Sequence, residues 1–83
     1  MVNELLFNLD RLHTTELGIV RIKRNLSLKT DDVVQWCRSK IQDSNSVITR
    51  NGKNWYVLID NAIITVNAHS YTIITAHKIK SSI

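Results

Sequence analysis

Leucines dominate the first twelve residues and recur every three or four positions, with polar residues between them. This spacing places apolar side chains on one face of a helix, so it predicts an amphipathic helix over residues 2–12. A second helix is expected after Thr14 and Thr15, either of which can cap it, and Glu16 suits its positive end. Because Gly18 costs about 1 kcal/mol relative to alanine inside a helix, a start at or after this glycine is the alternative. The apolar stripe of this second helix is Leu17, Ile19, Ile22 and Leu26.

Residues 27–43, SLKTDDVVQWCRSKIQD, carry the clearest helical pattern in the chain. Thr30 is a good N-cap, and Asp31 and Asp32 follow it where the helix macrodipole favours acidic side chains. The polar run DSNS, which begins at Asp43, is expected to end this third helix.

From Val47 onward the helical period gives way to the alternation of a β-strand. Asn51-Gly52 between two alternating stretches is a strong hairpin signal, and Asp60-Asn61 makes the next turn. Tight turns connect antiparallel neighbours, so the strands are expected to follow one another as a meander. The predicted strands cover residues 47–50, 54–59, 62–67 and 71–79.

The sequence therefore predicts an α+β fold, with two or three N-terminal helices packed on one face of a four-stranded antiparallel meander sheet. A chain of 83 residues encloses one core, so residues 1–83 are expected to form a single α+β domain. The chain has no proline and no low-complexity segment that would mark a linker.

Alternation along the strands separates an apolar face of the sheet from a polar one. The residues predicted to pack under the helices are Ile64, Val66, Ile74 and Ala76. The residues predicted to line an open, concave face are Thr65, Asn67, Thr75 and His77. By the same count Tyr71 shares the face of Thr75 and His77. Trp55 and Tyr56 point to opposite faces, so one is expected in the core and the other is free to stack on a base.

The net charge of the chain is +4, and the second half of the chain is the more basic. Such a balance permits contact with phosphate backbones without requiring it. Arg21 and Arg24 are three residues apart and share a helix face that can clamp phosphates, with a solvated face as the equal alternative. Lys53 at the predicted hairpin tip and Lys78 in the last strand complete the candidate nucleic-acid contacts, although solubility is the simpler account of Lys53.

The stretch NAHSYTIITAHK in the last quarter of the chain concentrates side chains that carry acid–base chemistry. His77 and Thr75 lie two residues apart on one strand face, so His77 is a candidate general acid or base for a ribose 2′-hydroxyl. Tyr71 is the third catalytic candidate on that face. A partly exposed histidine near a strand end is the simpler interpretation of His77. His69 is expected to form a turn, and His13 to cap a helix end.

Several kinds of site are excluded by what the sequence lacks. The chain has two glycines, which rules out a phosphate-binding glycine loop, and it has no Gly-x-Ser-x-Gly motif. A single cysteine, Cys37, cannot form an internal disulfide and fits a reducing cytoplasm. The spacing of His69 and His77 matches no recognised ligand pattern, so no metal is expected, and nothing predicts a cofactor. No apolar run approaches the ~20 residues of a membrane span, and the N-terminus does not resemble a secretory signal.

Four stretches of the chain carry a resemblance to a known family: TTELGIVRIKRNL, DVVQWCRSKI, GKNWYV and ITVNAHSYTIITAHK. They resemble a small bacterial family of domains of unknown function over residues 14–78, and this resemblance implies no particular activity. In size and order of elements the chain is also similar to the barnase, RelE and colicin class of small ribonucleases and toxins. That similarity implies metal-independent cleavage of RNA by side chains on the open sheet face. No glutamate follows Glu16, so the glutamate–histidine pair typical of barnase-like enzymes is missing.

Two functions stay open from the sequence. The first is a small cytoplasmic protein that acts on RNA through its open sheet face, as a metal-independent endoribonuclease of toxin type. The second is a non-enzymatic interaction module, such as an antitoxin, a phage or host regulator, or a homodimeric adaptor. Its partner would be a small protein or a second copy of the chain, and no membrane contact is expected.

Overall fold

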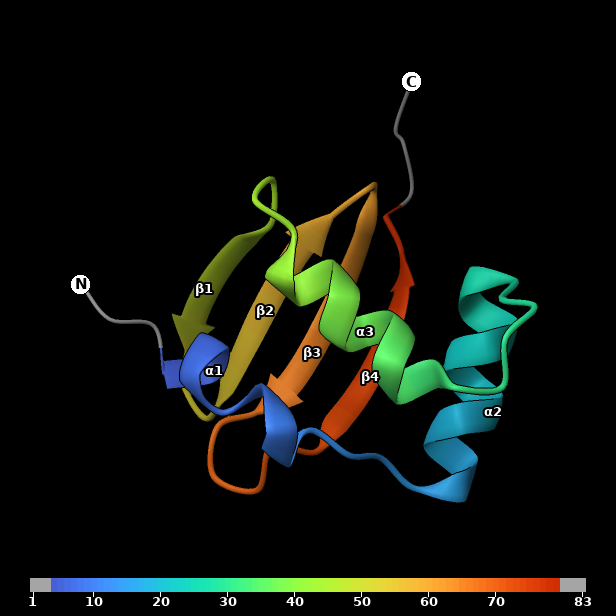
Figure 1. Ribbon diagram of the computed structural model, residues 1–83, viewed down its shortest axis with the longest axis horizontal. Helices are drawn as coiled ribbons and strands as arrows, with labels where there is room; N and C mark the ends of the chain where they lie inside the picture. Colours follow the sequence, from blue (N-terminus) through green and yellow to red (C-terminus); the bar gives the residue numbers. More distant parts are fainter. Residues whose placement is uncertain (1–3, 80–83) are drawn as a thin grey trace.

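The computed structural model describes residues 4–79, in which the helices precede the strands (Figure 1). The helical elements are α1 (Glu4–Phe7), the 3₁₀ turn η1 (Leu9–Arg11), α2 (Glu16–Leu26) and α3 (Val33–Gln42). The strands are β1 (Val47–Asn51), β2 (Asn54–Ile59), β3 (Ala62–Asn67) and β4 (Ile73–Lys78). The predicted α+β class is confirmed, and residues 2 and 3 of the first predicted helix lie outside the described residues.

The strands form one antiparallel sheet in the order β1-β2-β3-β4, which is the predicted meander. In the β1–β2 turn, Gly52 has a φ of 62°, a left-handed conformation that glycine adopts freely. In the β2–β3 turn, Asp60 and Asn61 have φ of 49° and 61°. Positive φ at both central residues is what a type I′ hairpin turn requires, and Asn and Asp tolerate it better than most residues. Both turns lie where the sequence predicts them.

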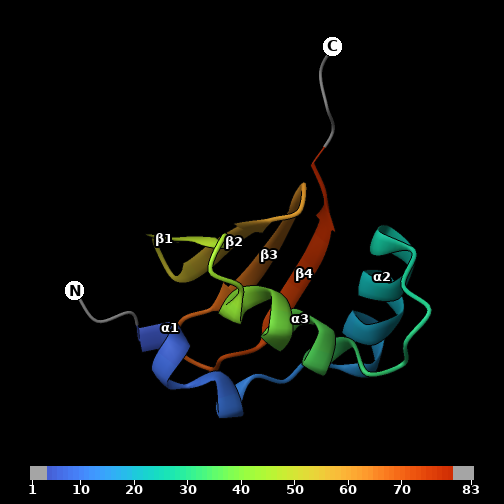
Figure 2. The same cartoon turned by 45° about the horizontal axis from the view of Figure 1, so that its top comes forward.

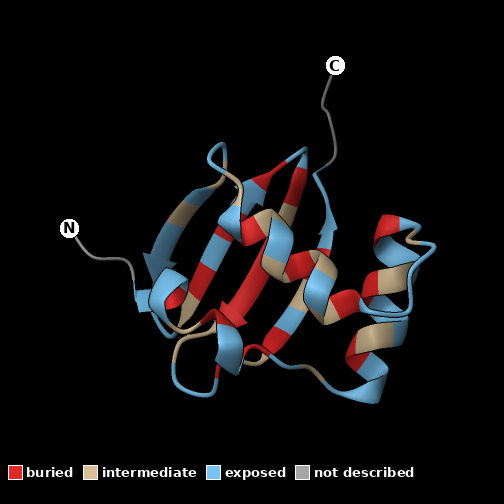
Figure 3. Ribbon diagram, viewed as in Figure 1, coloured by how far each residue is buried: buried red, intermediate tan, exposed pale blue. Residues whose placement is uncertain are grey.

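The helical segments cover one face of the sheet and leave the other uncovered (Figure 1 and Figure 2). Residues on the strands alternate between buried and exposed, most regularly on β2 (Figure 3). The sheet contributes to the core Trp55, Val57, Ile59, Ala62, Ile64, Val66, Ile73 and Ala76. The helical half contributes Leu5, Leu9, Leu12, Ile22, Leu26, Val33, Cys37 and Ile41. The predicted burial of Ile64, Val66 and Ala76 is therefore confirmed.

Helix α2 lies beside the edge strand β4 (Figure 1). Thr15 caps the helix with its side chain, as one of the two predicted caps. The Thr14 hydroxyl donates to the Ile73 carbonyl at 2.9 Å, and the Asn25 amide donates to the Ala76 carbonyl at 3.3 Å. These contacts occupy acceptors of β4, whereas β1 at the opposite edge of the sheet has no buried residue. The two edges of the sheet are thus protected to different degrees.

The first predicted helix is divided into two short turns. Helix α1 ends at Phe7, a 3₁₀ turn follows, and the amide of Asn8 donates to the carbonyl of Glu4 at 2.8 Å. Asparagine side chains compete with the backbone for such hydrogen bonds and so disfavour a helix interior. The prediction of one continuous helix over residues 2–12 is therefore wrong.

Two details of the other two helices also differ from the prediction, while the expected start of α2 before Gly18 is confirmed. Asp32 caps α3, because its carboxylate accepts from a backbone N–H of the first turn, and the predicted cap Thr30 lies outside the helix. Leu17 is 68% exposed, so it does not belong to the apolar stripe of α2. Gly18 lies inside α2, and a Cβ at this position would be 2.1 Å from the Thr14 hydroxyl. The close approach of Thr14 therefore explains a glycine within the helix.

A β-bulge interrupts the pairing of β3 with β4. Thr65 pairs with Thr75, but the next residue, Val66, pairs with Ile73, so Ile74 is an extra residue on β4. Ile73 is buried in the core, whereas Ile74 is 44% exposed. The predicted burial of Ile74 is wrong because simple alternation does not anticipate the bulge.

Tyr71 lies in the core and not on the open face. Its backbone has a φ of 60°, its side chain is 5% exposed, and its ring centroid is 5.3 Å from that of Trp55. The left-handed backbone of Tyr71 and the bulge at Ile74 both interrupt the regular alternation of side chains between Tyr71 and Thr75. The prediction that Tyr71 shares a face with Thr75 and His77 is therefore wrong.

Candidate functional site

The uncovered face of the sheet, which we call the open face, carries three rows of side chains that follow from the strand register. The apolar row contains Val47, Leu58 and Ile63 and ends in His77. The threonine row contains Thr49, Tyr56, Thr65 and Thr75, but Thr65 is only 7% exposed, so the prediction that it lines an open surface is wrong. The asparagine row contains Asn51, Asn54 and Asn67. The three rows contain no acidic residue, so the open face offers no like charge to a polyanion.

Tyr56 stands in the middle of the open face. It is 37% exposed, and it pairs with Thr49 on one side and Thr65 on the other. The Asn54 amide lies 3.5 Å from its hydroxyl, which is a long hydrogen bond. Trp55, the preceding residue, is in the core, so the prediction that these two aromatic residues divide between the faces is confirmed.

His77 and Thr75 lie on the open face, two residues apart on β4. His77 is exposed, and its imidazole makes no hydrogen bond or ion pair with the described residues. Thr75 is partly buried, and its hydroxyl makes no hydrogen bond with the described residues either. The residue paired with His77 across the strands is Ile63, which has no polar side-chain atom. A catalytic histidine needs a partner that fixes its tautomer and orientation, and the fold brings none to His77.

The predicted phosphate contacts are exposed, but they lie on different parts of the molecule. Arg21 precedes Asn25 by one helical turn, so it lies on the flank of α2 nearest to β4, whereas Arg24 lies further round the helix. Lys53 lies in the β1–β2 turn. Lys78 belongs by alternation to the helix-covered side of β4. None of these four cations forms an ion pair with another residue of the described chain.

The N-terminal segment and two connections meet at one end of the sheet, which we call the loop end. It consists of residues 11–13, 52–53 and 68–72. The Ala68 N–H donates to the Lys53 carbonyl at 2.8 Å. His13 is inserted beside β4: its N–H donates to the Tyr71 carbonyl at 3.3 Å, and its carbonyl accepts from Ile73 at 2.7 Å. Backbone contacts therefore fix the loop end from three directions.

The side chain of His13 begins a series of hydrogen-bonded polar groups, which we call the hydroxyl chain. Its Nε2 lies 3.0 Å from the Thr72 hydroxyl, and the Thr72 hydroxyl lies 2.7 Å from the Ser70 hydroxyl. Ser70 in turn donates to the Asn67 side-chain oxygen at 3.2 Å. The second ring nitrogen of His13, Nδ1, lies 2.9 Å from the Arg11 carbonyl oxygen. Both nitrogens of this imidazole are therefore in use.

The hydrogen-bond network assigns the tautomer of His13. The Arg11 carbonyl can only accept, so Nδ1 must carry the proton of that hydrogen bond. In the neutral imidazole Nε2 is then the acceptor, and the Thr72 hydroxyl donates to it. A base, a hydroxyl within reach of it and a group that orients it are the elements of an acid–base site.

Two arginines, one in the loop end and one at the adjoining end of β1, lie over a pair of buried aromatic rings. The guanidinium carbon of Arg11 is 4.4 Å from the ring centroid of Tyr71, and that of Arg50 is 5.4 Å from the ring centroid of Trp55. Arg50 also donates to the Gly52 carbonyl at 3.0 Å. Cation–π contacts hold a guanidinium in place while leaving its N–H donors available. Two oriented cations therefore lie at this end of the molecule, one over the core residue Tyr71 and the other, Arg50, on the helix-covered side of β1 opposite Trp55.

The hydroxyl chain is the feature that sequence patterns miss. The predicted capping role of His13 is confirmed, because Nδ1 reaches the carbonyl of Arg11, the last residue of η1. Its contact with Thr72 joins residues 59 positions apart and depends on the parallel bridge between the two segments. The run of Asn, Ser and Thr residues after β3 is a local signal for a turn, and it does not indicate which histidine will reach it.

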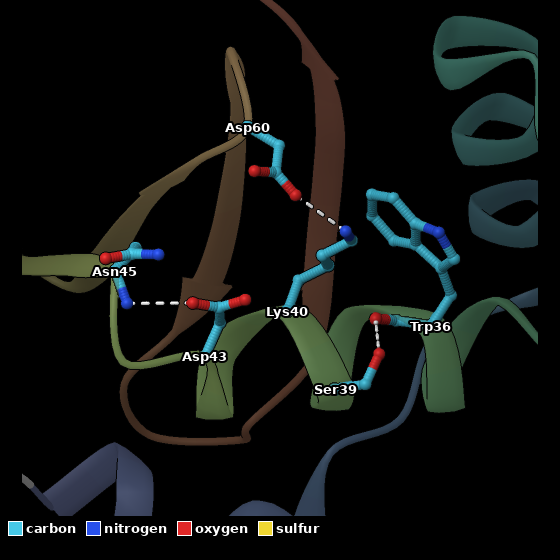
Figure 4. Close-up of polar contacts among 6 residues, drawn as sticks. All are labelled: Trp36, Ser39, Lys40, Asp43, Asn45 and Asp60. Carbon is cyan, nitrogen blue, oxygen red and sulfur yellow. Dashed lines mark hydrogen bonds and ion pairs between the residues drawn. The ribbon is translucent and has the colours of Figure 1, made fainter.

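The ion pairs of the described chain belong to the scaffold. Lys40 of α3 reaches Asp60 in the β2–β3 turn at 2.6 Å and lies over the ring of Trp36 (Figure 4). Lys23 pairs with Asp31, and the hydrogen bond and charge of this lysine lower the pKa of the Asp31 carboxyl. One pair joins α3 to the sheet and the other joins α2 to the segment before α3, and both are partly open to solvent, so they contribute modestly to stability.

The described residues offer little support for a reactive cysteine, a metal site or a membrane-spanning helix. Burial raises the pKa of the Cys37 thiol to about 12, which keeps it protonated and unreactive at neutral pH. Among residues 4–79 no three His, Cys, Asp or Glu side chains gather as metal ligands would. Over the same residues, no helix has the length and apolar character needed to cross a membrane.

Comparison with known proteins identifies the family of the chain but assigns no activity to it. Neither a curated protein nor a solved structure matches the chain. The similarity to small ribonucleases and toxins therefore stays a prediction, while the similarity to a family of unknown function is confirmed. A family model described as "Protein of unknown function (DUF3781)" matches residues 6–77. The chain belongs to this family.

Proposed function

We propose that the protein binds single-stranded RNA on its open face, with bases on the threonine and asparagine rows and phosphates at the loop end. The observation that carries the proposal is an uncovered, acid-free sheet face with Tyr56 exposed at its centre. Small four-stranded sheets recognise RNA by stacking unpaired bases on such aromatic side chains. Asn and Thr side chains beside the ring supply donors and acceptors for base edges.

Electrostatics support the same surface. Phosphate contacts supply much of the affinity of RNA-binding proteins, and they require cations that are not already paired with acids. Arg11 and Lys53 at the loop end meet this condition, and Arg50 adds a third unpaired charge on the helix-covered side of the neighbouring strand β1. Arg21 on α2 lies along the β4 side of the sheet. A strand of RNA that crosses the open face would therefore meet positive charge at its edges.

Fluorescence anisotropy with a labelled 12-nucleotide single-stranded RNA tests the proposal. Replacing Tyr56→Ala removes the stacking ring, which is expected to weaken binding about 5- to 150-fold, from ~1–3 kcal/mol per stacked base. Phe7→Ala is the matched control, because Phe7 is an aromatic residue, 71% exposed, on the helical side of the molecule. Absence of binding at low salt, or equal losses in the two variants, would contradict the proposal.

A protein partner is the second candidate, and the apolar row favours it. Val47 on the bare edge strand β1 is 56% exposed, and Leu58, its partner on β2, is 43% exposed. Exposed apolar side chains beside an unpaired strand edge are typical of surfaces that pair with another chain. Light scattering of the purified protein distinguishes the cases: a dimer that Leu58→Glu converts to a monomer supports self-association through this row, and a monomer at all concentrations excludes it.

A further inference from the structure

We infer that the hydroxyl chain at the loop end is an acid–base site that cleaves an RNA phosphodiester, with Ser70 meeting the substrate and His13 accepting the proton behind it. The inference rests on the proposed binding of RNA and adds a reaction to it. It assigns the proton transfer to His13, which stands at the far end of β4 from His77.

The hydroxyl chain is connected to the surface proposed to bind bases. Asn67 belongs to the asparagine row of the open face, and its side-chain oxygen also accepts from the Ser70 hydroxyl at 3.2 Å. The same oxygen accepts from the backbone N–H groups of His69 and Ser70, both at 2.9 Å, which holds the loop in one shape. A nucleotide on the asparagine row therefore has its ribose next to an exposed and fixed hydroxyl.

Every side chain of the series keeps a hydrogen bond in both protonation states of His13. When the imidazole is neutral, Thr72 donates to Nε2 and Ser70 can donate to Thr72. When the imidazole is charged, Nε2 donates to Thr72, Thr72 donates to Ser70, and Ser70 donates to Asn67. A proton can therefore be relayed from Ser70 through Thr72 to His13, each hydroxyl giving up one proton as it accepts another, and rotation of the two hydroxyls then restores the first arrangement.

The reaction is an internal transesterification. The ribose 2′-oxygen attacks the adjacent phosphorus while its proton moves to Ser70, the Ser70 proton to Thr72, and the Thr72 proton to Nε2 of His13. The bond from phosphorus to the 5′-oxygen breaks, and this oxygen takes a proton from water. The products are a 2′,3′-cyclic phosphate and a 5′-hydroxyl, and His13 returns its proton to solvent. Arg11 lies two residues before His13 and holds its guanidinium over the Tyr71 ring, and we expect its charge to offset that of the pentacoordinate phosphorus.

Cleavage of a labelled single-stranded RNA in the presence of a metal chelator tests the inference, using the full chain. Wild type is expected to release a fragment that ends in a cyclic phosphate. His13→Ala is expected to cut about 100-fold more slowly or worse, since general base catalysis contributes ~10²–10⁴-fold. RNA binding, measured by anisotropy, should change less than threefold. Added imidazole should restore part of the rate of His13→Ala, which a purely structural role of His13 would not allow.

Two further variants keep the outcome decisive. Ser70→Ala changes an exposed loop residue and is expected to slow cleavage at least tenfold, whether or not His13→Ala folds well. Ser44→Ala, which changes an exposed serine between α3 and β1 and outside the loop end, should cut at the wild-type rate. If wild type binds RNA but does not cut it, or if His13→Ala and Ser70→Ala cut normally, the inference fails and the proposed binding stands. If wild type does not bind RNA, the proposed function itself fails.

Discussion

His13 and His77 are both exposed histidines, but the fold gives them different surroundings. His13 uses both ring nitrogens, one on the Arg11 carbonyl and one on the Thr72 hydroxyl. His77 has no hydrogen-bonding partner among the described residues and continues an apolar row. Local sequence favours His77, which stands close to several hydroxyl residues, but strand register and the course of the N-terminal segment favour His13. The comparison shows that neighbours in space, which decide acid–base chemistry, are not the neighbours in sequence.

The largest effect is expected from removing the ring of Tyr71, which alternation places on the face of His77 and the structure places in the core. Tyr71→Ala is expected to lower the free energy of unfolding by about 3–5 kcal/mol, because the ring is buried against Trp55 and lies under Arg11. Thr75→Ala, on the open face, should cost less than about 1 kcal/mol. Urea denaturation of both variants measures the difference. Equal losses would show that Tyr71 is a surface residue, as simple alternation along β4 predicts.

Replacing one hydroxyl of the chain has a smaller expected effect. Thr72→Val keeps the shape of the side chain but removes its contacts with His13 and Ser70, so it should cost about 1 kcal/mol of unfolding free energy. Thr75→Val is the matched control, because Thr75 makes no hydrogen bond within the described residues and should change stability little. If the two variants unfold at the same urea concentration, the hydroxyl chain does not persist in solution.

The smallest effect is expected at the pair of Lys23 and Asp31, which touches neither histidine. Lysine lowers the pKa of the Asp31 carboxyl in the folded state, so the pair stabilises the fold above the ordinary value of 3.8. This contribution is lost as the pH falls through the lowered pKa, and it is small because the carboxyl is exposed. Melting temperatures from pH 6 to pH 2.5 should fall slightly more for wild type than for Asp31→Asn. A larger loss in the variant would reverse the sign of this linkage.

Much of the fold follows from local rules that the sequence displays. Gly52 in the first turn and Asp60-Asn61 in the second supply positive φ where the two tight turns need it, and these turns impose the antiparallel meander. Apolar alternation then assigns the core faces of β2 and β3, where no irregularity intervenes. The division of Trp55 and Tyr56 between the two faces can therefore be predicted from the pattern, but which of the two is exposed follows only from the structure.

The candidate site depends on features that are not local. The bulge at Ile74 and the left-handed backbone of Tyr71 reverse the faces assigned to both residues, and neither leaves a periodic signal. The bridge between His13 and Thr72 depends on how the N-terminal segment crosses the end of the sheet. Helical and strand periods describe neighbours within an element, so they cannot indicate this contact.

The tautomer of the two imidazoles tests the central claim most directly, because it does not depend on any activity. Long-range ¹H–¹⁵N correlation spectra of the protein at a pH where both histidines are neutral report which ring nitrogen carries the proton. The account expects His13 to be protonated at Nδ1, held there by the Arg11 carbonyl, and His77 to exchange between both forms. A His13 protonated at Nε2, or one that exchanges as freely as His77, would contradict the hydroxyl chain and the chemistry inferred from it.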